Sequence, residues 1–165
     1  MVGFEMSIDF EIRKSDNRAM KGILRILRLE FLPQSGEFAI LVVRLWLGLT
    51  MLLNHGLDKL LTFREKADMF LDPLGVGSTV SLMLAVLGEA VGSTLLVLGL
   101  FTRSAALSLV VTMGVACFLV HGGSLSGERS GELAFIYLAG FLAILIAGPG
   151  RFSMDQFLFA GRAGK

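Results

Sequence analysis

Four long apolar stretches dominate the pattern of the chain. They run from about Phe38 to Leu61, Val76 to Leu100, Ser104 to Val120 and Leu133 to Ala147. Each is close to the roughly 17–25 residues that a helix needs to cross a bilayer. The last three lack the polar face that a helix of a soluble bundle shows. The pattern therefore predicts an all-α integral membrane protein, a bundle of four transmembrane helices, rather than a soluble bundle.

A basic amphipathic segment precedes the first apolar stretch. From about Asn17 to Leu32, apolar residues recur at helical spacing while arginines and a lysine line another side. A helix of this kind lies flat on an anionic membrane surface, with docking to a partner protein as the alternative. We expect a tail with this interfacial helix over residues 1–37, a four-helix membrane domain over 38–157, and a second tail over 158–165.

Composition and charge narrow the class further. The chain has 165 residues, of which 54% are hydrophobic and only 18% are charged, so intrinsic disorder is excluded. One cysteine forms no internal disulfide, and a net charge of +1 gives no basic field for nucleic acid. The lipid bilayer is the expected partner.

The distribution of lysine and arginine predicts an orientation. Ten of the 15 lie in the two tails and in the connection between the second and third stretches, and four lie on the opposite side. Because cytoplasmic segments carry the excess of Lys and Arg, both termini are expected in the cytoplasm.

Charged and histidine side chains gather on one side of the first stretch. At 3.6 residues per turn, Arg44, His55, Asp58 and Lys59 share an arc of about 100°. Such charges cost about 2.5–3.5 kcal/mol each inside a bilayer, so they need partners. A rise of about 1.5 Å per residue puts Arg44 roughly 9 Å and Glu89 roughly 16 Å from the cytoplasmic boundary. The sequence predicts an intramembrane ion pair between Arg44 and Glu89, whose role is either chemical or only structural.

A second group of polar residues falls at the outer ends of the spans. It comprises His55, Lys59, His121 and Glu132, contributed by three helices. Histidine, lysine and carboxylate side chains suit a ligand site or a proton relay, which Glu89 would continue inward. Snorkelling of these side chains to the membrane surface is the alternative. No HxxxH, ExxH or CxxC spacing occurs, so we expect no metal site and no thiol–disulfide exchange.

Several short motifs occur in a fixed order along the chain. They are Arg44-Leu45-Trp46-Leu47-Gly48, Asn54-His55-Gly56-Leu57-Asp58-Lys59-Leu60, Gly88-Glu89, Val120-His121-Gly122, Gly131-Glu132-Leu133 and Gly148-Pro149-Gly150-Arg151. In these motifs the chain resembles the DoxX family over about residues 38–157. The resemblance implies a four-helix protein of the bacterial plasma (inner) membrane, similar to the small membrane subunit of thiosulfate:quinone oxidoreductase. It further implies redox work beside the quinone pool, often as one subunit of a complex.

Three functions are compatible with these observations as hypotheses. The first is a quinone-linked redox subunit or accessory, in which His55 or His121 donates to a quinone oxygen, Lys59 stabilises negative charge, and Glu132 and Glu89 handle protons. A membrane or soluble redox partner would supply the electrons. The second is a non-enzymatic membrane anchor that organises partners, and the third is a small proton-linked transporter using Glu89 and Arg44. A homo-oligomer is compatible with all three.

Overall fold

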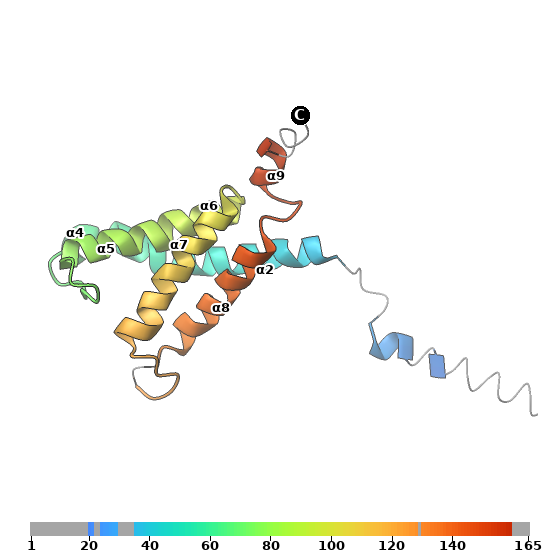
Figure 1. Cartoon of the computed structure of the whole chain (residues 1–165), viewed down its shortest axis with the longest axis horizontal. Coiled ribbons are helices and arrows are strands. Elements are labelled where there is room, and N and C mark those ends of the chain that lie inside the picture. Colours follow the sequence, from blue (N-terminus) through green and yellow to red (C-terminus); the bar gives the residue numbers. More distant parts are fainter. Residues whose placement is uncertain (1–19, 22–23, 30–34, 129, 160–165) are drawn as a thin grey trace, which may run out of the picture. The chain divides into compact units, whose positions relative to one another are not determined.

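The computed structural model describes residues 20–21, 24–29, 35–128 and 130–159, which fall into two units, Met1–Ser35 and Gly36–Lys165 (Figure 1). In the first unit, residues 20–21 and 24–27 are helical. Residues 28–29 form a turn, and the remaining residues of the amphipathic helix predicted from Asn17 to Leu32 lie outside the described residues. That helix and its place on a membrane therefore stay predictions. The end of the second predicted tail, residues 160–165, is also outside them.

Three continuous helices and one shorter helix build the second unit. The first helix joins α2 (Gly36–Met51), η1 (Leu52–Gly56) and α3 (Leu57–Leu61). The second joins α5 (Ser78–Val86), η2 (Leu87–Gly92) and α6 (Ser93–Leu98). The third joins α7 (Thr102–Gly114) and η3 (Val115–Val120), and the fourth is α8 (Glu132–Ala147). The short helices α4 (Phe63–Lys66) and α9 (Met154–Phe159) lie outside these four helices. The described residues contain no strand, which confirms the predicted all-helical class.

The first three of these helices are long and apolar enough to cross a membrane. They contain 26, 21 and 19 residues, whereas α8 has 16. At 1.5 Å per residue, α8 is about 24 Å long, less than the roughly 30 Å of a hydrocarbon core. The fourth predicted span therefore stays a prediction. Large apolar side chains such as Trp46, Leu53 and Val111 are exposed on the outside of the long helices, as lipid contact requires.

Each of the three long helices contains a π-helical turn: η1, η2 and η3. A π turn bonds residue i to residue i+5, so it rotates the side chains after it relative to an α-helix. His55 lies in η1 and Glu89 in η2, while His121 comes directly after η3. The π turns therefore change which neighbours these three side chains meet.

The helices pack around two apolar clusters. In Figure 1, α8 runs beside α7 in the opposite direction, and these two helices share a core with the first two helices. Its buried members are Met51, Leu96, Ala105, Ala106, Leu109, Met113, Tyr137, Phe141 and Ile144. A smaller cluster of Leu82, Val86 and Ala90 packs against Phe63 and Phe70, which belong to the connection after α3. This second cluster fixes that connection to the bundle.

Gly56 lets the first two helices touch through their backbones. A methyl group at this position would lie 2.7 Å from the carbonyl oxygen of Glu89 and 2.8 Å from the backbone of Ala90. Only a residue without a Cβ fits such a close approach. The contact sets the height of the first helix against η2, and with it the position of Glu89.

Arg44 holds the segment after α8. Its guanidinium is buried, and its Nη1 and Nη2 atoms donate hydrogen bonds of 2.5 Å to the carbonyl oxygens of Pro149 and Phe152. The predicted Arg44–Glu89 ion pair is therefore wrong. The chain leaves α8 at Gly148 and presents main-chain carbonyls without helical partners, and the guanidinium satisfies them.

Asp155 fixes the same segment to the start of α7. Its carboxylate accepts hydrogen bonds from the amides of Phe101 and Thr102 at 2.6 and 2.8 Å, and its own amide donates to the carbonyl of Gly99 at 2.8 Å. A negative charge is favourable at a helix N-terminus. The segment thus closes one end of the bundle.

Replacing Gly56 by alanine tests the close approach of the first two helices. The added methyl group meets backbone atoms that cannot rotate away, so we expect a loss of about 1–3 kcal/mol in the free energy of unfolding. Thermal unfolding in lipid nanodiscs, monitored by circular dichroism, measures this change. Gly114→Ala is the matched control, because nothing lies within 4 Å of its new methyl group. Equal melting temperatures for the two variants would contradict the packing described.

Candidate functional site

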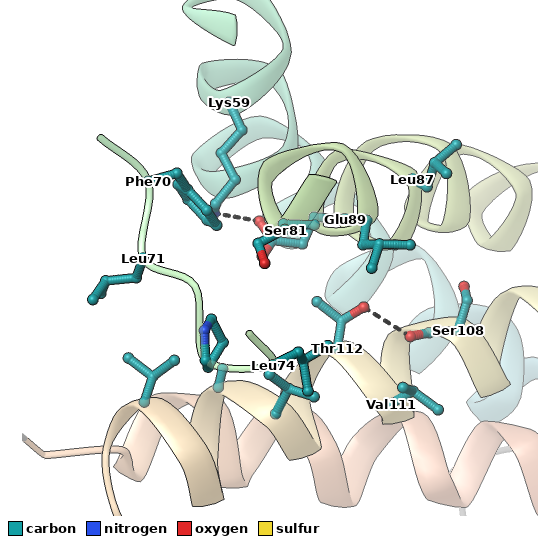
Figure 2. A pocket seen from close by; sticks show the side chains of 17 residues that line it. Lys59, Phe70, Leu71, Leu74, Ser81, Leu87, Glu89, Ser108, Val111 and Thr112 are labelled. Carbon is teal, nitrogen blue, oxygen red and sulfur yellow. Dashed lines mark hydrogen bonds and ion pairs between the residues drawn. The ribbon is translucent and has the colours of Figure 1, made fainter. Parts of the chain in front are cut away.

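A cavity of about 490 Å³ lies between the second and third long helices, and the end of the first helix and the connection after it complete its walls (Figure 2). Most of its lining is apolar. Its residues are Lys59, Phe70, Leu71, Pro73, Leu74, Ser81, Leu84, Ala85, Leu87, Gly88, Glu89, Ser108, Val111, Thr112, Val115, Ala116 and Val120. The volume falls in the range of small-molecule sites.

An ion pair between Lys59 and Glu89 supplies the charge in this cavity. The ammonium nitrogen of Lys59 lies 2.5 Å from Oε2 of Glu89, and the two side chains are 20% and 8% exposed. Charges in an apolar site are tolerated when they are paired and hydrogen-bonded. The pair therefore allows a lysine and a glutamate to stay charged at the wall of a cavity within the membrane-spanning helices.

Glycines place Glu89 at this wall. Gly88 packs so closely on the side chain of Thr112 that a methyl group there would overlap its hydroxyl, and a methyl group on Gly92 would lie 2.8 Å from the hydroxyl of Ser108. Together with Gly56, they bring three helices into contact around η2. The carboxylate of Glu89 is thus held where Lys59 reaches it from the first helix.

Three hydroxyl groups line the cavity, and each donates its proton within the protein. Ser81 donates to Oδ1 of Asp72, Ser108 to the carbonyl of Ala105, and Thr112 to the carbonyl of Ser108. Their oxygens keep acceptor capacity, whereas an ammonium group has three N–H donors of which Glu89 uses one. The cavity therefore offers Lys59 as a donor, and Glu89 with the hydroxyl oxygens as acceptors.

Asp72 organises the connection that forms one wall. Its carboxylate accepts hydrogen bonds from the amides of Val76 (3.0 Å) and Gly77 (2.7 Å) and from the hydroxyl of Ser81 (2.7 Å). The bond from Ser81, then that from Gly77, lowers the pKa of Asp72 below its usual range. The turn holds Phe70, Leu71, Pro73 and Leu74 along the cavity.

The five residues predicted as one ligand or relay cluster do not all line the cavity. Lys59 and Glu89 line the cavity, and His55, His121 and Glu132 do not. His55 packs edge-on against the ring of Tyr137 of α8, with ring centres 6.0 Å apart. His121 packs its Cβ against Gly131, and Glu132 is exposed at the first position of α8.

Several residues of the site carry no signal in the sequence. Ser81, Ser108 and Thr112 are hydroxyl residues inside apolar helices and belong to no motif. Tyr137, which packs against His55 outside the cavity and also stacks on Phe141, lies in an uninterrupted apolar stretch. Asp72 could have been found, because an Asp-Pro with two glycines and a serine shortly after it is a turn signal that precedes a helix.

Within the described part of the chain, no group of three or more His, Cys, Asp or Glu side chains could hold a metal ion. The one cysteine, Cys117, is buried in η3. The chemistry that the cavity offers is thus that of the ion pair and the hydroxyl groups.

Comparison with known proteins identifies the family. The DoxX family profile matches residues 39–122, about half of the chain. The chain belongs to the DoxX family. Every residue that lines the cavity falls inside the matched DoxX region.

Two relatives, both from Haemophilus influenzae, are described as uncharacterized proteins. One is 37% identical over 116 residues, which cover 66% of this chain and 83% of the relative. The other is 28% identical over 99 residues, which cover 58% of this chain and 66% of the relative. No solved structure matches the chain.

A double-mutant cycle tests the pairing of Lys59 with Glu89. Lys59→Met leaves a carboxylate unpaired in an apolar site, so we expect a loss on the order of 3 kcal/mol in the free energy of unfolding. Adding Glu89→Gln should recover part of that loss, and the coupling is read from unfolding of the four proteins in nanodiscs. Lys66→Met is the control, since it breaks the exposed Asp58–Lys66 pair and should change much less. Additive single-variant effects would rule out the pair.

The lowered pKa of Asp72 predicts a pH dependence of the turn. Because the folded turn favours the carboxylate, its contribution to stability is fully present above the ordinary value of about 3.9 and is lost as pH falls through the lowered pKa. The amide NMR signal of Gly77 should titrate with a midpoint below about 3.9. In Asp72→Asn this titration should be absent. A wild-type midpoint at or above the ordinary value contradicts the hydrogen bonding described.

Proposed function

We propose that this DoxX protein binds a quinone in the cavity beside Lys59 and Glu89, and acts as a quinone-linked redox subunit or accessory of a membrane oxidoreductase. The observation that carries the proposal is the ion pair at the wall of an otherwise apolar cavity between membrane-spanning helices. Apolar walls with a few convergent polar groups are typical of sites for ring compounds.

The hydrogen-bonding groups suit both redox forms of such a ligand. A quinone has carbonyl oxygens that accept hydrogen bonds. In the cavity lining, the ammonium group of Lys59 is the group that donates to them. A quinol has hydroxyl groups that donate, and Glu89 or the oxygens of Ser108 and Thr112 accept. One cavity can therefore hold the oxidised and the reduced ligand without leaving a buried polar group unpaired.

The same pair handles protons in this proposal. Reduction of a quinone to a quinol consumes two electrons and two protons. Lys59 stabilises negative charge that develops on a ring oxygen, and Glu89 accepts or passes a proton. His55, His121 and Glu132 are candidates for the path to the membrane surface. His121 and Glu132 lie in a connection and at a helix start, and His55 lies in η1, one turn before Lys59.

The electrons come from a redox partner protein of the membrane or the aqueous phase. The proposal places the chain in a bacterial inner membrane with both termini in the cytoplasm, on the basis of the lysine and arginine distribution and the family. Anionic lipid at the cytoplasmic surface would hold the basic N-terminal segment.

Binding of a radiolabelled benzoquinone to the purified protein in nanodiscs tests this function. Lys59→Met removes a charge-assisted hydrogen bond, so we expect its dissociation constant to rise roughly 10- to 100-fold. Glu89→Gln should weaken quinol binding more than quinone binding, because the carboxylate accepts from a hydroxyl group. Lys66→Met, a lysine in α4 outside the cavity, is the control and should bind as the wild type does. Absence of saturable binding to the wild type would refute the proposal.

A further inference from the structure

We infer that the ligand reaches the Lys59–Glu89 cavity from inside the bilayer, through a side opening between η2 and α7, and that it carries a hydrocarbon tail that stays in this opening. The inference rests on the proposed function and specifies the class of ligand: an uncharged, membrane-dissolved compound rather than a water-soluble one.

The opening is marked by cavity residues that are themselves exposed on the outside of the bundle. Leu87 of η2 is 52% exposed and Val111 of α7 is 59% exposed, and both line the cavity. Figure 2 shows them on the two helices that face each other across it. Both belong to helices that can span a membrane, so the surface between them faces hydrocarbon.

The depth of the opening selects among membrane compounds. Glu89 lies about half-way along the helix from Ser78 to Leu98, only two residues after Leu87, and Val111 precedes the Thr112 that touches Gly88. The opening is therefore near the middle of the bilayer. A lipid with a charged head group keeps that group at the membrane surface, whereas an uncharged compound dissolves at this depth.

The floor of the cavity is shaped for an extended chain. Small residues line it on both helices: Ala85 and Gly88 on one, and Ser108, Thr112 and Ala116 on the other. The last three recur at intervals of four residues and thus form one row along the helix. From Ser108 to Val120 the lining covers about 18 Å at 1.5 Å per residue, longer than a single ring requires.

The connection after α3 borders the other end of the cavity, and Leu71 and Leu74 of this connection are 67% and 49% exposed. Phe70 packs against the cluster of Leu82, Val86 and Ala90, and Asp72 ties its turn to Ser81. These two contacts hold the connection in place, and a ligand entering from the aqueous side would pass along it. The side opening between Leu87 and Val111 differs from this route because it faces hydrocarbon, in which an uncharged compound dissolves.

Blocking the opening tests the inference. The probes are a radiolabelled benzoquinone with a ten-carbon tail and the same ring without a tail, each bound to the protein in phosphatidylcholine nanodiscs. Val111→Trp fills the space beside Leu87, so binding of the tailed probe should weaken roughly tenfold or more, as expected when about two methylene groups leave an apolar surface. The tail-less probe should change less than about twofold.

Leu107→Trp is the matched control. Leu107 lies one turn before Val111 on α7, is 52% exposed, and does not line the cavity. This variant should bind both probes as the wild type does. A tailed probe with a photoreactive group at the end of its tail should label Leu84, Leu87 or Val111, and not the turn at residues 70–77.

The outcomes separate the two proposals. If both probes bind in a manner that depends on Lys59, but Val111→Trp behaves as Leu107→Trp does, the side entry is overturned and the binding function stands. Labelling confined to residues 70–77 overturns the side entry in the same way. If neither probe binds the wild type, the binding function fails, and the entry route fails with it.

Discussion

The ion pair between Lys59 and Glu89 is the constraint on which the rest of the membrane domain depends. A single charge among apolar helices costs several kcal/mol, and this cost is reduced only if an opposite charge arrives at hydrogen-bonding distance. Lys59 arrives because Gly56, one turn earlier, lets its helix touch the backbone of η2. The close packing of the first two helices at Gly56 is therefore also what brings Lys59 and Glu89 together so that their charges neutralise each other.

Arg44 meets the same requirement by a different route. Its buried guanidinium has main-chain carbonyls as partners, and these belong to the segment after α8 that Asp155 also holds. Its Nη1 and Nη2 groups are thereby committed to closing one end of the bundle. The transporter hypothesis required Arg44 and Glu89 to act together along one path. Arg44 instead lies in a fixed structural contact, and Glu89 is paired with Lys59, so this arrangement argues against such a path.

The spans could be predicted from the sequence and the pairing could not, for a physical reason. Apolar runs are a local property, so the three long helices can be located from composition alone. Predicting which charged side chains pair requires the angular position of each side chain about its helix axis. Counting 3.6 residues per turn from Arg44 places His55 and Lys59 on its face, but the count crosses η1, whose π turn rotates the side chains after it. His55 therefore meets Tyr137, and Lys59 meets Glu89.

The neutrality of the pair bears on which ligands the cavity can accept. An anionic ligand would compete with Glu89 for Lys59 and leave one negative charge unpaired within the helices, and a cationic ligand would do the same to Lys59. A carbonyl compound adds an acceptor to the remaining N–H groups of Lys59 and leaves the total charge unchanged. The electrostatics of Lys59 and Glu89 therefore favour uncharged ligands, and the bilayer interior between Leu87 and Val111 is where such compounds dissolve.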